Sequence, residues 1–242
     1  MKKNIVLWMS LLALLTLAAG VCSCSSDDED DETADAEIIK YDQTYQISFY
    51  NRAPYSNSEQ GYWYPGEDGK EVFCRLTPST KAPYTLLVVP KGEKGFETIN
   101  YLKQQDFISN VQELSSESEK RYMLTSTMYF KCPYLYVSDS YMVENYESVG
   151  YAAFILPQII VKMKPGYDIS TVTELYKNGL TLTKTENFQQ GTTLYYLDCN
   201  ICNIKSSYDM LRLTAEIYHL GMVEWAECNK YGGIGWCLTN YH

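Results

Sequence analysis

The order of strand-like and helix-like segments between residues 155 and 229 constrains the fold of this chain more than any other feature. Residues 158–164 alternate apolar and polar side chains, as a half-buried strand does, and the Pro165-Gly166 pair signals its end. The segments that follow predict a helix, two strands, a second helix and a last strand, at residues 168–179, 180–185, 192–199, 206–221 and 222–228. This order is that of the ferredoxin-like arrangement. The sequence therefore predicts an α+β fold that ends in a ferredoxin-like βαββαβ unit.

Both predicted helices carry start and stop signals. Asp168 is suited to cap the first helix, and Gly179 is suited to end it. Ser206 and Asp209 form the S-x-x-D pattern that starts a helix. The second helix has an apolar stripe that stops at Gly221 and consists of Met210, Leu213 and Ile217. These signals support the predicted order of elements.

Two stretches of this segment resemble the propeptide of secreted subtilisin-like serine peptidases, of the fervidolysin-like type. Residues 161–166 (VKMKPG) are similar to the strand that opens this prodomain. Residues 221–229 (GMVEWAECN) are similar to its closing strand, with Cys228 where proline is usual. A looser similarity to the longer prodomains of Bacteroidetes subtilases lies at residues 61–76. The resemblance implies a prodomain that inhibits or chaperones a peptidase, and that peptidase is expected to act in trans because only 13 residues follow Asn229.

Residues 1–23 are predicted to be a lipoprotein signal peptide. Lys2 and Lys3 precede a 15-residue apolar run, which is short for a membrane span. The run leads to Val21-Cys22-Ser23-Cys24, which resembles a bacterial lipobox, so Cys24 is the predicted lipidation site and the bilayer a predicted partner. Two alternatives stay open: lipid on Cys22, or an ordinary secretory signal with unmodified cysteines.

Residues 24–37 are predicted to be a solvated acidic tether. Residues 27–32 are six consecutive carboxylates, which repel one another and resist burial. A calcium loop is the weaker interpretation, because the glycine turn and the alternating ligands are missing. An acidic run behind a lipidated cysteine resembles the export signal of Bacteroidetes surface lipoproteins, which implies the outer face of the outer membrane.

The charge of the remaining chain disfavours nucleic acid as a partner. The formal net charge of −10 becomes −12 without Lys2 and Lys3, and −6 when the six tether acids are set aside. A nucleic-acid-binding domain needs a basic face, and the sequence contains no Lys/Arg cluster.

Residues 38–154 are predicted to be a separate β-rich domain, with its boundary to the C-terminal unit (155–229) inside residues 143–157. Its strand-like runs are residues 45–50, 61–64, 72–76, 84–89, 121–130, 134–143 and 148–154. One helix is predicted at residues 96–104. The chain has 23 tyrosines, which favours half-exposed sheets over a ligand surface. Two clusters keep ligand stacking open as an alternative: Tyr62, Trp63 and Tyr64, and Tyr134, Tyr136 and Tyr141.

Six cysteines lie beyond the lipobox, and an even number in an exported chain favours disulfides. They are Cys74, Cys132, Cys199, Cys202, Cys228 and Cys237, and the last four are expected to be oxidised. A redox reading of Cys199-x-x-Cys202 is disfavoured because the pair closes a strand instead of opening a helix. Zinc is disfavoured because His219 and His242 are the sole histidines.

The sequence predicts a non-enzyme without cofactor or metal. The Asp, His and Ser motifs of subtilases do not occur, nor do G-x-S-x-G, H-E-x-x-H or a phosphate-binding glycine loop. In subtilase propeptides the segment after the last strand lies in the substrate cleft, so the resemblance implies the same role for the tail at residues 230–242. The tail side chains expected to fill apolar subsites are Trp236, Leu238 and Tyr241. A tail that packs on its own sheet is the alternative to peptidase binding, and a non-catalytic cell-surface binding or structural module is the alternative function.

Overall fold

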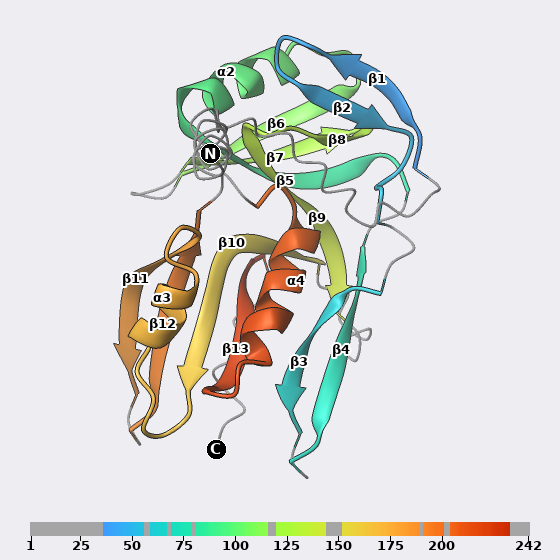
Figure 1. Ribbon diagram of the computed structural model, residues 1–242. Helices are drawn as coiled ribbons and strands as arrows, with labels where there is room; N and C mark the ends of the chain where they lie inside the picture. The colour runs from blue at the N-terminus through green and yellow to red at the C-terminus, as the bar shows by residue number, and fades with distance from the viewer. Residues whose placement is uncertain are drawn as a thin grey trace, which may run out of the picture. The chain divides into compact units, whose positions relative to one another are not determined.

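The computed structural model describes residues 36–232, except 56–58, 67–68, 79–80, 116–119, 144–151, 189–190 and 201–203. The fold is α+β and is dominated by antiparallel sheets, as predicted (Figure 1). The N-terminal elements are β1 (Ile38–Asp42), β2 (Ile47–Tyr50), β3 (Gly61–Pro65), β4 (Glu71–Pro78), β5 (Tyr84–Pro90), α2 (Gly92–Leu102), β6 (Ile108–Ser115), β7 (Lys120–Ser126), β8 (Tyr129–Lys131) and β9 (Leu135–Val143). The C-terminal elements are β10 (Ala152–Met163), α3 (Ser170–Leu175), β11 (Leu180–Asn187), β12 (Thr193–Cys199), α4 (Ser207–Tyr218) and β13 (Val223–Tyr231). Among the described helices, none is long and apolar enough to cross a membrane.

The strands form one small sheet and one large sheet. The small sheet has the order β1-β2-β8. The large sheet follows the path β11-β12-β10-β9-β5-β7-β6, while β13 pairs with β10 and the β3–β4 hairpin joins β9 through β4. Strand β10 pairs with β9 at Ala152–Phe154, and with β12 and β13 over most of its remaining length. The sheet thus continues across the predicted domain boundary, and the division at residue 154 stays a prediction.

The C-terminal elements follow the predicted order, but their bounds differ. Strand β10 begins at Ala152 instead of residue 158, so it includes the described part of the run predicted as a separate strand at residues 148–154. Helix α4 begins with the predicted capping box, in which the Ser206 side chain accepts from the Asp209 N–H and the Asp209 side chain accepts from the Ser206 N–H. Helix α3 is shorter than predicted and has Ile169 at its N-cap. Asp168 lies one residue before this N-cap, and its side chain accepts the Ser170 N–H at 2.8 Å in the first turn of the helix.

The N-terminal half departs further from the predicted elements. Strand β6 was not predicted, because its sequence ISNVQELS is mostly polar. Helix α2 starts at Gly92 instead of residue 96, and a Cβ on Gly95 would lie 2.7 Å from the Tyr134 carbonyl oxygen. Gly95, inside the first turns of α2, therefore permits close packing of the helix against the backbone at Tyr134. The run at residues 121–130 forms two strands, because the Ser126 hydroxyl bonds both the N–H and the carbonyl of Met128 and turns the chain.

Two main clusters of buried side chains form the interior. The C-terminal core is mostly aliphatic and packs α3 and α4 on β10, β12 and β13. The N-terminal core is rich in tyrosine and phenylalanine and packs α2 between the small sheet and strands β5, β7 and β9. Strand β9 contributes to both cores, with Tyr136 and Tyr141 in the first and Leu135 and Val137 in the second.

Candidate functional site

The two stretches that carry the propeptide resemblance are neighbours in space. They form the antiparallel pair of β10 and β13, with Val161 opposite Ala226 and Lys162 opposite Trp225. The pairing register shifts beside Glu224, whose carboxylate accepts from the Lys162 ammonium at 2.6 Å. Lys164 extends the contact, because its ammonium donates to the Gly221 carbonyl at 2.9 Å. The two motifs are therefore halves of one structural unit.

The four C-terminal strands have one face covered by helices and one face free of them. The strand order is β13-β10-β12-β11, with each neighbouring pair antiparallel. Side chains Ile159, Val161 and Met163 belong to the core beneath α3 and α4, whose ribbons lie on the same side of these strands in Figure 1. Because side chains alternate along a strand, the residues between them point to the other face.

This helix-free face carries a compact apolar cluster. Its buried members are Leu194, Tyr196 and Trp225, and Ile160 and Tyr64 pack against them. Among the described elements no helix covers it. Leu194, Tyr196 and Trp225 are each less than a tenth exposed, so the accessible apolar side chains of this cluster are the half-buried Ile160 and Tyr64.

Charged side chains border the apolar cluster. The Tyr196 hydroxyl donates to Glu186 at 2.6 Å, and the Lys184 ammonium lies 4.9 Å from the Tyr196 ring centroid. Lys184 also pairs with Glu186. Burial and the bond to Glu186 raise the pKa of Tyr196 to about 12, while the bond from Lys184 lowers the pKa of Glu186. The Glu186 carboxylate therefore stays ionised across the neutral pH range.

A buried ion pair connects β13 to the β3–β4 hairpin. Glu227 is 3% exposed and pairs with Lys230, whose ammonium lies 4.1 Å from the Tyr62 ring centroid. Strand β13 runs on to Tyr231, beyond the predicted end of the last strand at residue 228. Lys230 and Tyr231, the first two residues of the predicted tail, are thus strand residues.

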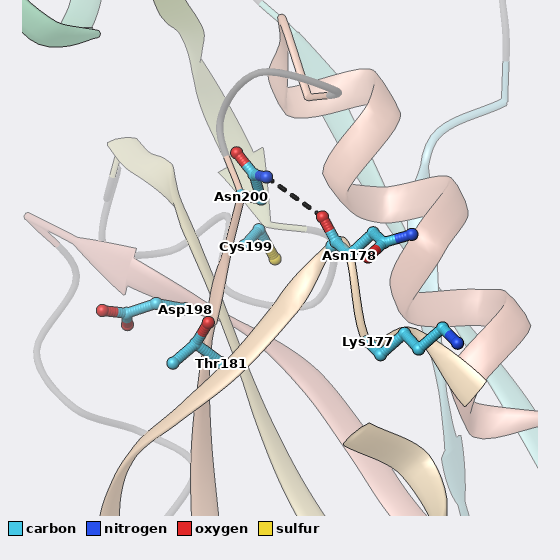
Figure 2. Close-up of a pocket in the computed structure, with 7 residues that line it drawn as sticks. Lys177, Asn178, Thr181, Asp198, Cys199 and Asn200 are labelled. Atoms are coloured by element: carbon cyan, nitrogen blue, oxygen red, sulfur yellow. Dashed lines mark hydrogen bonds between the residues drawn. The ribbon is translucent and has the colours of Figure 1, made fainter. Parts of the chain in front are cut away.

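The hollow beside the ends of β11 and β12 is small and polar. It has a volume of about 550 Å³ and is lined by Lys177, Asn178, Gly179, Thr181, Asp198, Cys199 and Asn200. Figure 2 shows its rim held by the Asn200 side chain, which donates to the Asn178 carbonyl at 3.0 Å. Asp198 is exposed and already accepts from Thr183 and Gln158. Burial raises the pKa of the Cys199 thiol, so the hollow offers no activated nucleophile among its lining residues.

An isolated carboxyl group lies in the interior near the N-terminus of α4. Asp139 of β9 is fully buried, and neither of its carboxylate oxygens has a hydrogen-bond partner among the described residues. Burial raises its pKa to about 8, and the Tyr55 hydroxyl opposes that shift only in part. The charge of Asp139 in turn raises the pKa values of Tyr55, Tyr84, Tyr129 and Tyr141, second to burial.

Hydrogen bonds link the tyrosines around Asp139 to several elements. The Tyr55 and Tyr129 hydroxyls contact each other. The Tyr141 hydroxyl donates to the Gln60 side chain at 2.8 Å and lies 2.6 Å from the Ser207 hydroxyl. The sequence analysis did not single out Asp139, although a signal was present: its place in β9 continues the apolar alternation of Leu135 and Val137.

The predicted site residues lie largely outside the part of the chain that the structure describes. This applies to the lipidation site Cys24, to its alternative Cys22, and to the tail residues Trp236, Leu238 and Tyr241. The lipoprotein signal and most of the acidic tether lie there as well. Of the two aromatic clusters, Tyr136 and Tyr141 are fully buried, so ligand stacking is wrong for these two.

Four cysteines are described, and all are buried and outside any disulfide. They are Cys74, Cys132, Cys199 and Cys228. Burial raises the pKa of Cys132 to about 11 and that of Cys228 to about 12, so both are unreactive at neutral pH. The expected oxidation of Cys199 and Cys228 is not seen within the described residues, while Cys202 and Cys237 lie outside them. In the same described part, no three His, Cys, Asp or Glu side chains gather as metal ligands.

Comparison with known proteins does not assign the chain to a family. No protein-family model matches it, and no curated protein matches it either.

Proposed function

We propose that this protein binds a subtilisin-like serine peptidase in trans and inhibits it or assists its folding, through a ferredoxin-like C-terminal unit. The observation that carries the proposal is the pairing of β10 with β13, because these strands contain the two stretches that resemble the propeptide. Numbered within the unit, the strand order β13-β10-β12-β11 is 4-1-3-2, which supports a ferredoxin-like arrangement.

The helix-free face is the proposed contact surface. The half-buried Ile160 and Tyr64 supply apolar area above the buried Leu194, Tyr196 and Trp225, and the side chains around them supply charges. Aromatic anchors inside a polar rim are the arrangement that contributes most to binding free energy in protein complexes. The tail beyond Tyr231 is the proposed second contact, with Trp236, Leu238 and Tyr241 in the substrate cleft.

The proposed location is the outer membrane surface, with a lipid anchor on Cys24. The support is the lipobox-like sequence and the acidic run that follows it. A tether of this composition stays extended, which places the folded part at a distance from the bilayer and within reach of a partner.

The second candidate function is a non-catalytic cell-surface binding or structural module. The observation that favours it is the continuity of the large sheet, in which β9 pairs with both β10 and β5. A prodomain-like unit that shares one sheet with the rest of the chain acts as part of a larger binding or structural scaffold. Peptidase binding is then not its function.

Inhibition assays with a matched pair of variants test the peptidase proposal. The chain is mixed with a subtilisin-like peptidase, and cleavage of a small peptide substrate is followed. Ile160→Asp places a charge in the helix-free face, and we expect at least about a tenfold loss of inhibition, since charged atoms in an interface centre cost more than about 1.4 kcal/mol. Leu175→Asp is the control, because Leu175 is 60% exposed at the end of α3. Removal of residues 233–242 measures the contribution of the tail separately.

The outcomes separate the two candidate functions. Inhibition that Ile160→Asp weakens and Leu175→Asp leaves intact supports the peptidase proposal. If the folded chain neither inhibits nor speeds the refolding of such a peptidase at micromolar concentration, the peptidase proposal fails and the binding or structural module stands.

A further inference from the structure

Asp139 occupies a position where the strand pattern calls for an apolar residue. Along β9, side chains Leu135 and Val137 point into the N-terminal core, and Asp139 is the next residue in the same phase. Its backbone is opposite Leu86 in β5, in the interior of the large sheet. A carboxyl group here is removed from water on all sides.

The surroundings of Asp139 hold hydroxyl groups and little charge. The titratable groups that face it are Tyr84 from β5, Tyr129 from β8, Tyr141 from β9 and Tyr55 from the segment before β3. Two charged groups lie farther out: Arg52, which acts on Tyr84, and Asp209 of α4, which acts on Tyr129 and Tyr141. The Asp209 side chain already accepts the Ser206 N–H in the capping box at the start of α4.

No cation offsets a negative charge on Asp139. Among the described groups, burial and the Tyr55 hydroxyl account for the behaviour of this carboxyl, with no lysine or arginine contributing. An ionised carboxylate without a partner is far more costly in a protein interior than the neutral acid, which also gains a donor O–H. The described surroundings therefore favour the protonated form.

We propose that Asp139 is a buried proton-binding site that makes the junction between the two cores sensitive to pH. The tyrosine cluster closes around the neutral acid, and loss of the proton leaves an uncompensated charge that opens the cluster. The elements that meet there are the segment at residues 51–55, strands β8 and β9, and the first turn of α4. Tyr55 stacks on Tyr208 with ring centroids 5.3 Å apart, so movement of one is passed to the other.

The direction of the pH dependence follows from proton linkage. The ordinary pKa of the side chain is 3.8, and burial raises the pKa of Asp139 to about 8 in the folded protein. Between these values the folded state holds a proton that the unfolded chain has released. The free energy of unfolding therefore falls as pH rises from about 4 to about 8, and Asp139 adds no further change above that range.

Denaturation of the full chain in a mild non-ionic detergent, followed as a function of pH, tests the proposal. The denaturation midpoint is recorded at pH 5, 7 and 9 for the wild type, for Asp139→Asn and for the exposed control Asp106→Asn. We expect the midpoint of the wild type and the control to fall with rising pH more steeply than that of Asp139→Asn. Identical pH profiles for wild type and Asp139→Asn would overturn the proposal.

Two readouts on the wild type decide the matter even if Asp139→Asn does not fold. Infrared spectra should contain the band of a protonated carboxylic acid at pH 7, where exposed carboxyls are ionised, and this band should fade above about pH 8. Amide hydrogen exchange at residues 51–55 and 206–210 should then accelerate relative to the C-terminal core at β10, after correction for the intrinsic pH dependence of exchange. A missing band at pH 7, or exchange that accelerates equally everywhere, contradicts the proposal.

Discussion

The two cores of this protein are built from different kinds of buried side chain. The C-terminal core is made from residues such as Ile159, Val161, Met210 and Ile217, which need only to be excluded from water. The N-terminal core buries whole tyrosines, among them Tyr84 and Tyr129, and each hydroxyl requires a partner. An aliphatic core is specified by the spacing of apolar residues, whereas a tyrosine core is specified by a hydrogen-bond network as well. The first can be found in a sequence pattern, and the second requires the three-dimensional arrangement.

The largest expected effect tests the aliphatic core. Ile159 is fully buried in β10 beneath the helices, so Ile159→Ala should lower the free energy of unfolding by about 3 kcal/mol through lost burial and an unfilled cavity. Ile160→Ala is the matched control on the same strand, where the side chain is only half-buried and the expected loss is about 1 kcal/mol. Urea denaturation measures both. Equal losses would mean that the two faces of β10 are equally buried, which would contradict the difference in burial between Ile159 and Ile160.

A smaller effect is expected where a tyrosine hydroxyl is removed. Tyr141→Phe keeps the ring but leaves the Gln60 and Ser207 side chains without this partner, so the free energy of unfolding should fall by about 1.5 kcal/mol. Tyr167→Phe is the control, since Tyr167 is 54% exposed and the change should stay within about 0.5 kcal/mol. Thermal denaturation of both variants is the measurement. A Tyr141→Phe protein as stable as the wild type would show that the network adds nothing to the packing of the rings.

The smallest effect concerns the start of α4, where the two cores meet. Ser206→Ala removes the side chain that accepts the Asp209 N–H, and the expected loss is about 1 kcal/mol. Ser206→Gly should cost only a few tenths of a kcal/mol, about a third of that loss, because glycine is a better N-cap residue than alanine. Chemical denaturation with both variants in parallel gives the comparison. The reverse order of the two losses would mean that the Ser206 side chain is not the cap.

The sequence predicted the C-terminal elements well because local signals determine them. The alternation in β10, the capping box at Ser206 and the turn at Gly166, where φ is +86°, are each encoded within a few residues. The pairing of β10 with β13 was implied by the resemblance and joins segments about 60 residues apart, such as Lys162 and Glu224.

Other features depend on contacts that no local pattern reveals. Strand β6 is polar because it lies at the end of the sheet path, where β7 is its sole strand neighbour among the described elements. Asp139 is in phase with the apolar Leu135 and Val137, but a carboxylate is normally exposed, so its burial without a charged partner is established only by its three-dimensional surroundings. The hairpin β3–β4 reaches the C-terminal core through Tyr62 and Trp63, a contact far beyond any sequence window.

The position of β13 has a consequence for the folding of the chain. Strand β10 is synthesised about 60 residues before β13, its partner over most of its length. Until β13 emerges, this edge of β10 presents unpaired backbone groups, with Ile159 and Val161 also uncovered. Such long-range pairing is slow and leaves aggregation-prone intermediates. Folding of the C-terminal half is therefore completed late, and the unpaired edge of β10 is the part of the nascent protein with the greatest need of a chaperone.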